Sequence, residues 1–309
     1  MTAAGEGANA QGADGMYVGI DVGGSAIKGG LVTRRGELIL EDARRTPVEA
    51  GRAGIVEAIA DLAVTLIDSS RSPVIGVGIG SAGAIDPDTG SVSRATDNLP
   101  GWTGTPLAEL LAERTGLPVK VDNDVHAAAL GEAWTGAAKT YDSFVFVALG
   151  TGVGGALTSR GRIIHGFRGT AGEIGHMLIK PDGLLCNCGQ RGCWEQYTSG
   201  TALNRMAKEI EGFWDSHLLF KRFAEGDSRA VEAVDSFVKD LATGLVSLQN
   251  VFGPEAIIIG GGLAQSSILW WESLEHRLKE MTTLPVTIIA AKLGNRAGVI
   301  GAARLAKGI

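Results

Sequence analysis

Residues 144–158 read Phe-Val-Phe-Val-Ala-Leu-Gly-Thr-Gly-Val-Gly-Gly-Ala-Leu-Thr, an apolar run that is broken by a glycine-rich turn and then resumes. The pattern predicts strands over 144–149 and 155–158, followed by a third over 162–165. The same order opens the chain, where strands are expected over 16–21, 30–33 and 38–40 and glycines follow the first of them. The sequence therefore predicts a duplicated architecture in which two units begin with the same three-strand meander.

After each meander, helices and strands alternate, which predicts that part of each sheet is parallel. Apolar residues recur at helical spacing from residue 54 to 67, and 74–79 is typical of a buried strand. Residues 123–133 form an alanine-rich helix with Asp122 or Asn123 as its cap. The other expected elements are helices over 106–115, 200–212, 216–225, 228–252 and 297–307, and strands over 118–121, 256–259 and 285–290.

Length and composition describe an enzyme-sized globular protein. The 309 residues, 45% of them hydrophobic, are enough for two cores and about two domains. The net charge of -6, with no basic run, argues against a nucleic-acid surface and favours small-molecule partners. The first fifteen residues lack the basic and apolar parts of a signal peptide and indicate a disordered tail. No apolar stretch is long enough to span a bilayer, so we expect a cytoplasmic protein without a membrane partner.

All three cysteines lie close together, at positions 186, 188 and 193, and His176 precedes them. One histidine and three cysteines make a complete tetrahedral zinc site, and glycines at 189 and 192 allow the sharp turns that such a knuckle needs. Four protein ligands leave no open position, so this zinc would be structural. The alternative is a cluster of reduced thiols. A disulfide is disfavoured because Cys186 and Cys188 are too near for easy bridging and three is an odd number.

Three glycine-rich turns follow predicted strands and could bring backbone N–H groups close to phosphate. One turn alone is equally typical of a tight hairpin, whereas two in equivalent places favour a phosphate clamp between two domains. The turns lack both the Walker sequence and the helix and acidic residue of a dinucleotide site. The candidate nucleotide-binding residues are Asp21, Gly23, Gly24, Ser25, Lys28, Gly150, Thr151, Gly152, Gly154, Gly260, Gly261 and Gly262, with Asp21 orienting Mg²⁺ through water.

Five motifs in this order resemble the ROK group of sugar kinases and repressors, most closely its bacterial glucokinases. They are DVGGS at 21–25, VDNDVHAAALGE at 121–132, LGTGVGG at 149–155, GTAGEIGH at 169–176 and CNCGQRGCWE at 186–195. The resemblance runs from about residue 16 to the C-terminus. It implies an actin-like α/β fold of two ribonuclease-H-like domains with sugar and nucleotide in the cleft between them. We expect a tail over 1–15, a small domain over 16–122 that the helix at 297–309 rejoins, and a large domain over 123–296 with the zinc knuckle at 176–193.

The resemblance also assigns the sugar site. Asp124 opens a helix, where the helix dipole favours an ionised carboxylate, and in similar kinases this aspartate takes the proton of the sugar's 6-hydroxyl. Without the resemblance, Asn123 and Asp124 would be read as a helix cap, and Glu195 as a solvated acid. His176 would bind zinc through one ring nitrogen and face a hydroxyl with the other. The residues assigned to hexose contacts are Gly83, Asn98, Asn123, Asp124, Glu173, His176 and Glu195.

The chain departs from the family pattern at four positions. Thr96 and Asp97 stand where alanine and proline are more usual, and His126 replaces an asparagine. Asp97 and His126 leave the choice of sugar open, and Ser25 replaces threonine but keeps the hydroxyl. We expect His126 to lie on the helix surface or behind the catalytic residues.

Together these features predict a glucokinase that uses ATP and Mg²⁺, and the resemblance implies a homodimer or a higher homo-oligomer. The alternatives are a kinase of an amino or N-acetyl hexose and a polyphosphate-using glucokinase. A sugar-responsive repressor is disfavoured, because only about fifteen residues precede Met16 and leave no room for a DNA-binding domain.

Overall fold

The computed structural model describes residues 15–95 and 98–308. Two five-stranded sheets are built in the same way, with strand orders β3-β2-β1-β4-β7 and β10-β9-β8-β11-β12. In each, the first three strands of the order are antiparallel and the last two join in parallel. The duplicated architecture predicted from residues 144–158 is therefore confirmed.

The elements of the first half form the first sheet, a two-stranded sheet of β5 and β6, and the helices beside them. They are β1 (Met16–Val22), β2 (Ala26–Val32), β3 (Leu38–Arg45), η1 (Val48–Ala50), α1 (Gly51–Asp68), β4 (Val74–Ser81), β5 (Ala84–Ile85), β6 (Val92–Arg94), α2 (Leu107–Thr115), β7 (Val119–Asn123) and α3 (Asp124–Thr135).

The second half forms the second sheet, a group of helices that covers it, and a last helix. Its elements are β8 (Phe144–Leu149), β9 (Val153–Ser159), β10 (Arg162–Ile163), η2 (Phe167–Gly169), η3 (Ile174–His176), α4 (Glu195–Thr198), α5 (Gly200–Ile210), α6 (Ser216–Ala224), α7 (Ser228–Phe252), β11 (Ala256–Gly260), η4 (Gly262–Leu269), α8 (Trp271–Met281), β12 (Ile288–Ala290), η5 (Gly294–Arg296) and α9 (Ala297–Lys307).

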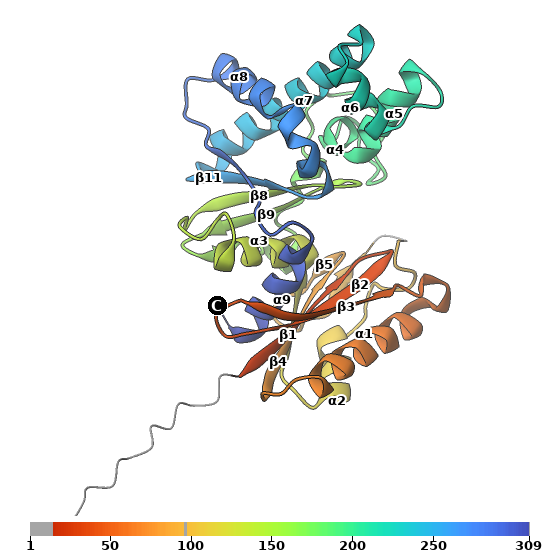
Figure 1. The fold of residues 1–309 in the computed structure, drawn as a ribbon, viewed down its shortest axis with the longest axis vertical. Helices are drawn as coiled ribbons and strands as arrows, with labels where there is room; N and C mark the ends of the chain where they lie inside the picture. Colours follow the sequence, from red (N-terminus) through yellow and green to blue (C-terminus); the bar gives the residue numbers. More distant parts are fainter. Residues whose placement is uncertain (1–14, 96–97, 309) are drawn as a thin grey trace, which may run out of the picture.

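Helices and sheets alternate in a stack of layers (Figure 1). Helix α1 packs on one face of the first sheet, where Gly29 meets Leu62 and Leu66, while the neighbouring Gly30 meets Val299 of α9 on the other face. The second sheet lies between α3 and the helical group around α7. Each sheet has its own buried core, in agreement with the two cores expected from composition.

Helix α9 lies between α3 and the first sheet (Figure 1). Its small residues allow this close approach. A Cβ at Gly301 would collide with the carbonyl of Ala127 in α3, and one at Gly78 of β4 would collide with the carbonyl of Ala302. The resemblance implied that this helix rejoins the small domain, whereas its own residues indicated no packing partner, because a run of small residues has no strong apolar face.

Some predicted boundaries were wrong. Strand β2 begins at Ala26 rather than residue 30, so Lys28 lies within a strand and pairs with Asp21 of β1. Strand β10 is only two residues long, and helix α8 was not predicted. Helix α8 buries only Leu274 and Leu278 among many charged residues, so its helical pattern in the sequence is weak.

Two expectations fall outside the structure. Residues 1–14 of the expected tail, and Thr96 and Asp97 among the departures, are not among the described residues. Within 15–95 and 98–308, no helix has both the length and the apolar character needed to cross a bilayer.

Candidate active site

Asp124 is held at the first turn of α3 by the residue before it. The Asn123 side chain caps the helix: its Oδ1 accepts hydrogen bonds from the backbone N–H groups of Val125 and His126 at 2.9 and 3.3 Å. Its Nδ2 donates to the carbonyl of Gly83 at 2.9 Å. Of the two caps considered, Asn123 is the one used. The cap fixes the backbone that carries Asp124.

A second carboxylate, Asp21, lies near Asp124. It is opposite Lys28 on β2 and next to Gly80 on β4, and a Cβ at Gly80 would lie 3.4 Å from the Cα of Asp124. Burial, and then repulsion by Asp124, raise the pKa of Asp21 to about 6, although Lys28 opposes the shift. Burial also raises the pKa of Asp124. Two half-buried carboxylates with one lysine opposite Asp21 make a site suited to a proton and a cation.

The first glycine turn connects β1 to β2 and lies next to a candidate sugar residue. The hydroxyl of Thr46 donates to the carbonyl of Gly23 at 2.6 Å, and the N–H of Thr46 donates to the carbonyl of Ser25. A Cβ at Gly24 would lie 3.5 Å from the backbone oxygen of Asn98. The structure therefore brings the first phosphate turn and Asn98 together.

The second glycine turn occupies the equivalent place between β8 and β9. The N–H of Gly150 donates to the carbonyl of Gly152 at 2.9 Å, and the N–H of Gly200 donates to the carbonyl of Gly150 at 2.8 Å. The third run, residues 260–262, follows β11, which is the parallel neighbour of β8. Gly261 has a φ of +87°, and a Cβ there would collide with Leu149 at the end of β8. The second and third glycine runs thus meet at one edge of the second sheet.

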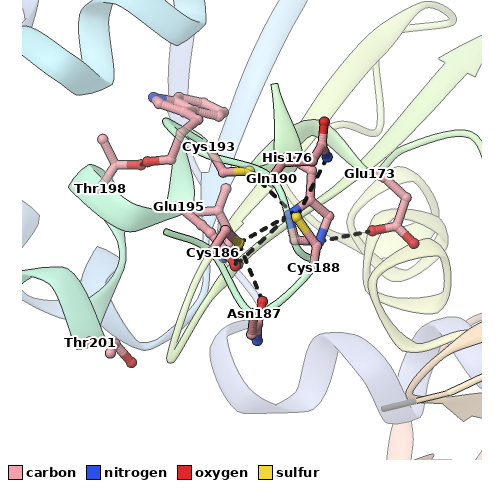
Figure 2. A network of polar contacts seen from close by, with 12 residues as sticks. Glu173, His176, Cys186, Asn187, Cys188, Gln190, Cys193, Glu195, Thr198 and Thr201 are labelled. Carbon is pink, nitrogen blue, oxygen red and sulfur yellow. Dashed lines mark hydrogen bonds and ion pairs between the residues drawn. The ribbon is translucent and has the colours of Figure 1, made fainter. Parts of the chain in front are cut away.

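His176 lies between the cysteines and a candidate sugar residue, as Figure 2 shows. Its Nδ1 is 3.7 Å from the Sγ of Cys186 and 3.8 Å from Oε1 of Glu195. Its Nε2 faces the other way and is 3.9 Å from Oε2 of Glu173. The two ring nitrogens are therefore directed to different surroundings, the thiols on one side and Glu173 on the other.

The knuckle residues have the spacing of a tetrahedral metal site. One ligand atom each from His176, Cys186, Cys188 and Cys193 lies within 4.8 Å of the others. The Sγ atoms of Cys188 and Cys193 are 3.6 Å apart. Two thiolates on one zinc, each with a bond of 2.3 Å, are about 3.7 Å apart. Desolvation and the neighbouring thiols raise the pKa of Cys193 to about 12, so this sulfur needs a cation to become a ligand.

The knuckle is anchored to the helical group. The indole Nε1 of Trp194 donates to the carbonyl of Asp240 in α7 at 2.9 Å, and the ring fills the space beside Gly244. Lys180 reaches the carboxylate of Asp240 at 2.6 Å. The same contacts fix the start of α4, which carries Glu195.

The sequence predicted that Glu195 faces a sugar, but both of its carboxylate oxygens lie near protein groups. Its Oε1 accepts from Cys186 at 3.1 Å, and its Oε2 is 3.4 Å from the N–H of Val153 and close to Gly152. The carboxylate therefore lies between the knuckle and the second glycine turn. Glu173 is more open and forms an ion pair of 3.6 Å with Arg94 of β6, a residue that the sequence reasoning missed.

His126 is 2% exposed, so its expected place on the helix surface was wrong and a place behind Asp124 was right. Its Nδ1 is 2.9 Å from Asp122, whose other oxygen is 2.7 Å from Nε2 of His165. The sequence gave no role to His165 and considered Asp122 only as a cap. One signal for this cluster is available in the sequence: the chain has five histidines, and two of them are His126 and His165.

Comparison with known proteins identifies the family. The model of the ROK family matches residues 17–309. The chain belongs to the ROK family. A glucokinase of Halalkalibacterium halodurans is 37% identical over 95% of this chain and 96% of its own, and one of Thermotoga maritima is 34% identical over 94% and 96%.

Solved ROK structures have the same fold. A ROK glucokinase from Streptomyces griseus, in complex with glucose and AMPPNP, is 33% identical and superimposes with a TM-score of 0.82, covering 95% of this chain and 99% of that one. A ROK hexokinase from Thermus thermophilus gives a TM-score of 0.86 at 33% identity, with 94% and 98% covered. The actin-like fold expected for this ROK chain is therefore confirmed.

Proposed function

We propose that this ROK protein is a glucokinase that transfers the γ-phosphoryl group of ATP to the 6-hydroxyl of D-glucose. The observation that carries the proposal is Asp124: a half-buried carboxylate at a capped helix start, close to Asp21, which pairs with Lys28. The similarity to several glucokinases at 34–37% identity supports glucose as the acceptor and ATP as the donor.

Asp124 is the general base in this mechanism. It accepts the proton of the 6-hydroxyl as that oxygen attacks the γ-phosphorus, and ADP leaves on the opposite side. A carboxylate whose pKa is raised by burial is a stronger base than an exposed one, yet its place at a helix start still favours ionisation. Asn123 holds Asp124 in place through its cap and its bond to Gly83, and its amide group is suited to bind a neighbouring hydroxyl.

The glycine turns at 23–25 and 150–152 place backbone N–H groups around the phosphates, and 260–262 offers bare backbone to the nucleoside. Lys28 and Asp21 pair across β1 and β2 beside the first turn, and Asp21 lies near Asp124. Mg²⁺, when bound, neutralises charge on the phosphates, and Asp21 is the carboxylate suited to orient it through water. The raised pKa of Asp21 fits this role, because a nearby cation would favour the ionised form.

We also propose that His176, Cys186, Cys188 and Cys193 hold one structural Zn²⁺. Bound there, the ion would fix the His176 ring through Nδ1 and leave Nε2 to face a sugar hydroxyl beside Glu173. The knuckle would thereby order one wall of the sugar site. We propose in addition that the protein is a homodimer, which light scattering of the purified protein would test.

A kinase of N-acetylglucosamine is the second candidate. An N-acetyl-D-glucosamine kinase of Vibrio cholerae is 34% identical over 94% of this chain and 99% of its own. The two activities share the 6-hydroxyl and the base, so the site described above serves either of them.

A coupled assay with purified protein distinguishes these candidates. Glucose, mannose, glucosamine and N-acetylglucosamine are each tested with ATP and with polyphosphate, and the Asp124→Asn variant serves as the blank. We expect glucose with ATP to give the highest kcat/KM. Each polar group left unpaired by another sugar costs about 1 to 3 kcal/mol, or roughly five- to hundredfold in rate. A preference of more than about tenfold for N-acetylglucosamine would replace the glucokinase proposal with the second candidate.

A further inference from the structure

One buried carboxylate, that of Asp122, accepts three hydrogen bonds. Its Oδ1 accepts from Nδ1 of His126 at 2.9 Å and from the backbone N–H of Asn123 at 2.7 Å. Its Oδ2 accepts from Nε2 of His165 at 2.7 Å. Asp122 is 3% exposed and His126 is 2% exposed, so the bond between them is shielded from water, while the His165 side chain is 25% exposed.

The three side chains come from both halves of the molecule. Asp122 lies on β7 of the first sheet, two residues before Asp124, and His126 is in the first turn of α3. His165 lies just beyond β10 of the second sheet. The carboxylate therefore joins the start of α3 to the edge of the second sheet, 43 residues away in sequence.

His165 also begins the segment that leads to Glu173. Its carbonyl accepts from the N–H of Ala171 at 2.9 Å, which closes this loop on itself. The following Gly172 lies against the second histidine, since a Cβ there would be 3.3 Å from Nε2 of His126. Both histidines thus contact the loop on which Glu173 lies, while Asp122 holds the peptide of Asn123.

The charges suit a strong connection. Hydrogen bonds from the two histidines hold the pKa of Asp122 well below its usual range in spite of its burial. The bond to Asp122 in turn raises the pKa of His165. Hydrogen bonds to an ionised, buried carboxylate are about twice as strong as neutral ones. Nδ1 of His126 and the backbone N–H of Asn123 both donate to Oδ1, and Nε2 of His165 donates to Oδ2. Both carboxylate oxygens therefore have hydrogen-bond donors without a metal ion.

We propose that Asp122, His126 and His165 are positioning residues for phosphoryl transfer, which set Asp124 and Asn123 against the loop of Glu173. This rests on the proposed function, in which Asp124 is the base and Glu173 faces the sugar. The network connects the two walls of the acceptor site, and none of its three hydrogen bonds goes to a glycine turn. Its loss should therefore lower kcat and raise the KM for the sugar, and leave the KM for ATP unchanged.

Two matched pairs of variants test the geometry. His165 donates through Nε2, whose place the amide nitrogen of glutamine can take, whereas asparagine is too short. His126 donates through Nδ1, which asparagine matches and glutamine does not. We expect His165→Gln and His126→Asn to keep kcat within about threefold of wild type. We expect His165→Asn and His126→Gln to lose about tenfold or more, because a bond to a charged group is lost.

A merely structural role would not produce this pattern. It would lower the folded fraction, and kcat with it, but would leave the sugar KM unchanged. Equal kcat values within each matched pair, or a rise in the KM for ATP equal to that for the sugar, would overturn the proposal.

A measurement without substrates keeps the network separate from the proposed function. In ¹⁵N-labelled wild-type protein, NMR should show a protonated Nδ1 on His126 and a protonated Nε2 on His165, assigned by the loss of each signal in His126→Leu and His165→Leu. An unprotonated nitrogen at either position would overturn the network. A wild-type protein that phosphorylates no sugar would overturn the proposed function and the positioning role with it, while the NMR signals still report the hydrogen bonds.

Discussion

Replacing Asp124 with asparagine should separate activity from stability. The asparagine side chain has the same shape, and the helix cap is made by Asn123, so α3 should keep its place. Removing a general base lowers turnover by about a thousandfold, which is about 4 kcal/mol in the barrier. The fold should become more stable, because burial raises the pKa of Asp124 and its ionised form is disfavoured in the native state.

The Asp124→Asn substitution should also change the pKa of Asp21. Repulsion by Asp124 contributes to the pKa of about 6 at Asp21, so this pKa should fall toward its usual range in the variant. The assays are steady-state kinetics with glucose and ATP, thermal unfolding near neutral pH, and titration of the Asp21 carboxyl by ¹³C NMR. Asp88→Asn, at an exposed position, is the control and should change none of the three. An Asp124→Asn enzyme that keeps a tenth of wild-type turnover, or whose Tm falls while its Asp21 titrates as before, would refute the reasoning.

Three further predictions concern the metal, the pH response and the last helix. Elemental analysis of active protein prepared without chelator should give one zinc per chain, and Cys193→Ser should lose it; active wild-type protein without zinc would contradict the site. The ion pair between His165 and Asp122 should stabilise the fold fully below about pH 6.5, the ordinary pKa of histidine, and lose its charge as the pH rises through the raised pKa of His165. The difference in Tm between wild type and His165→Gln should therefore shrink as the pH rises through the raised pKa of His165, and a constant difference would speak against the pair. Gly301→Ala, which collides with α3, should lower the free energy of unfolding by about 1 to 3 kcal/mol in denaturant titrations, whereas Gly212→Ala, with open space around it, should not.

The features that the sequence predicted well are local. The strands and glycine turns were visible because apolar alternation and turn residues act over a few positions. The ligand atoms of His176 and the three cysteines lie together because short, glycine-containing segments connect them. The zinc itself, like the roles assigned to the sugar and nucleotide residues, stays a prediction.

The features that the sequence did not predict depend on contacts between distant segments. The hydrogen bond between Asp122 and His165 forms only when the edges of two sheets meet, and no sequence pattern around either residue predicts it. The direction of Glu195 depends on the second glycine turn, which lies 42 residues earlier in the chain. Helix α8 shows a different limit, because two buried leucines among charged residues give too weak a periodicity.

The position of α9 has a consequence for how the protein is made. Residues 16–123 leave the ribosome first, but the face of β1 and β4 that receives Gly298, Val299 and Ala302 stays uncovered until 297–307 have been synthesised. The first sheet therefore keeps an apolar face exposed to solvent until translation is almost complete. A nascent chain in this state is a natural client for chaperones. By the same logic, a separately supplied peptide of α9 should bind to a fragment that lacks this helix and stabilise its fold.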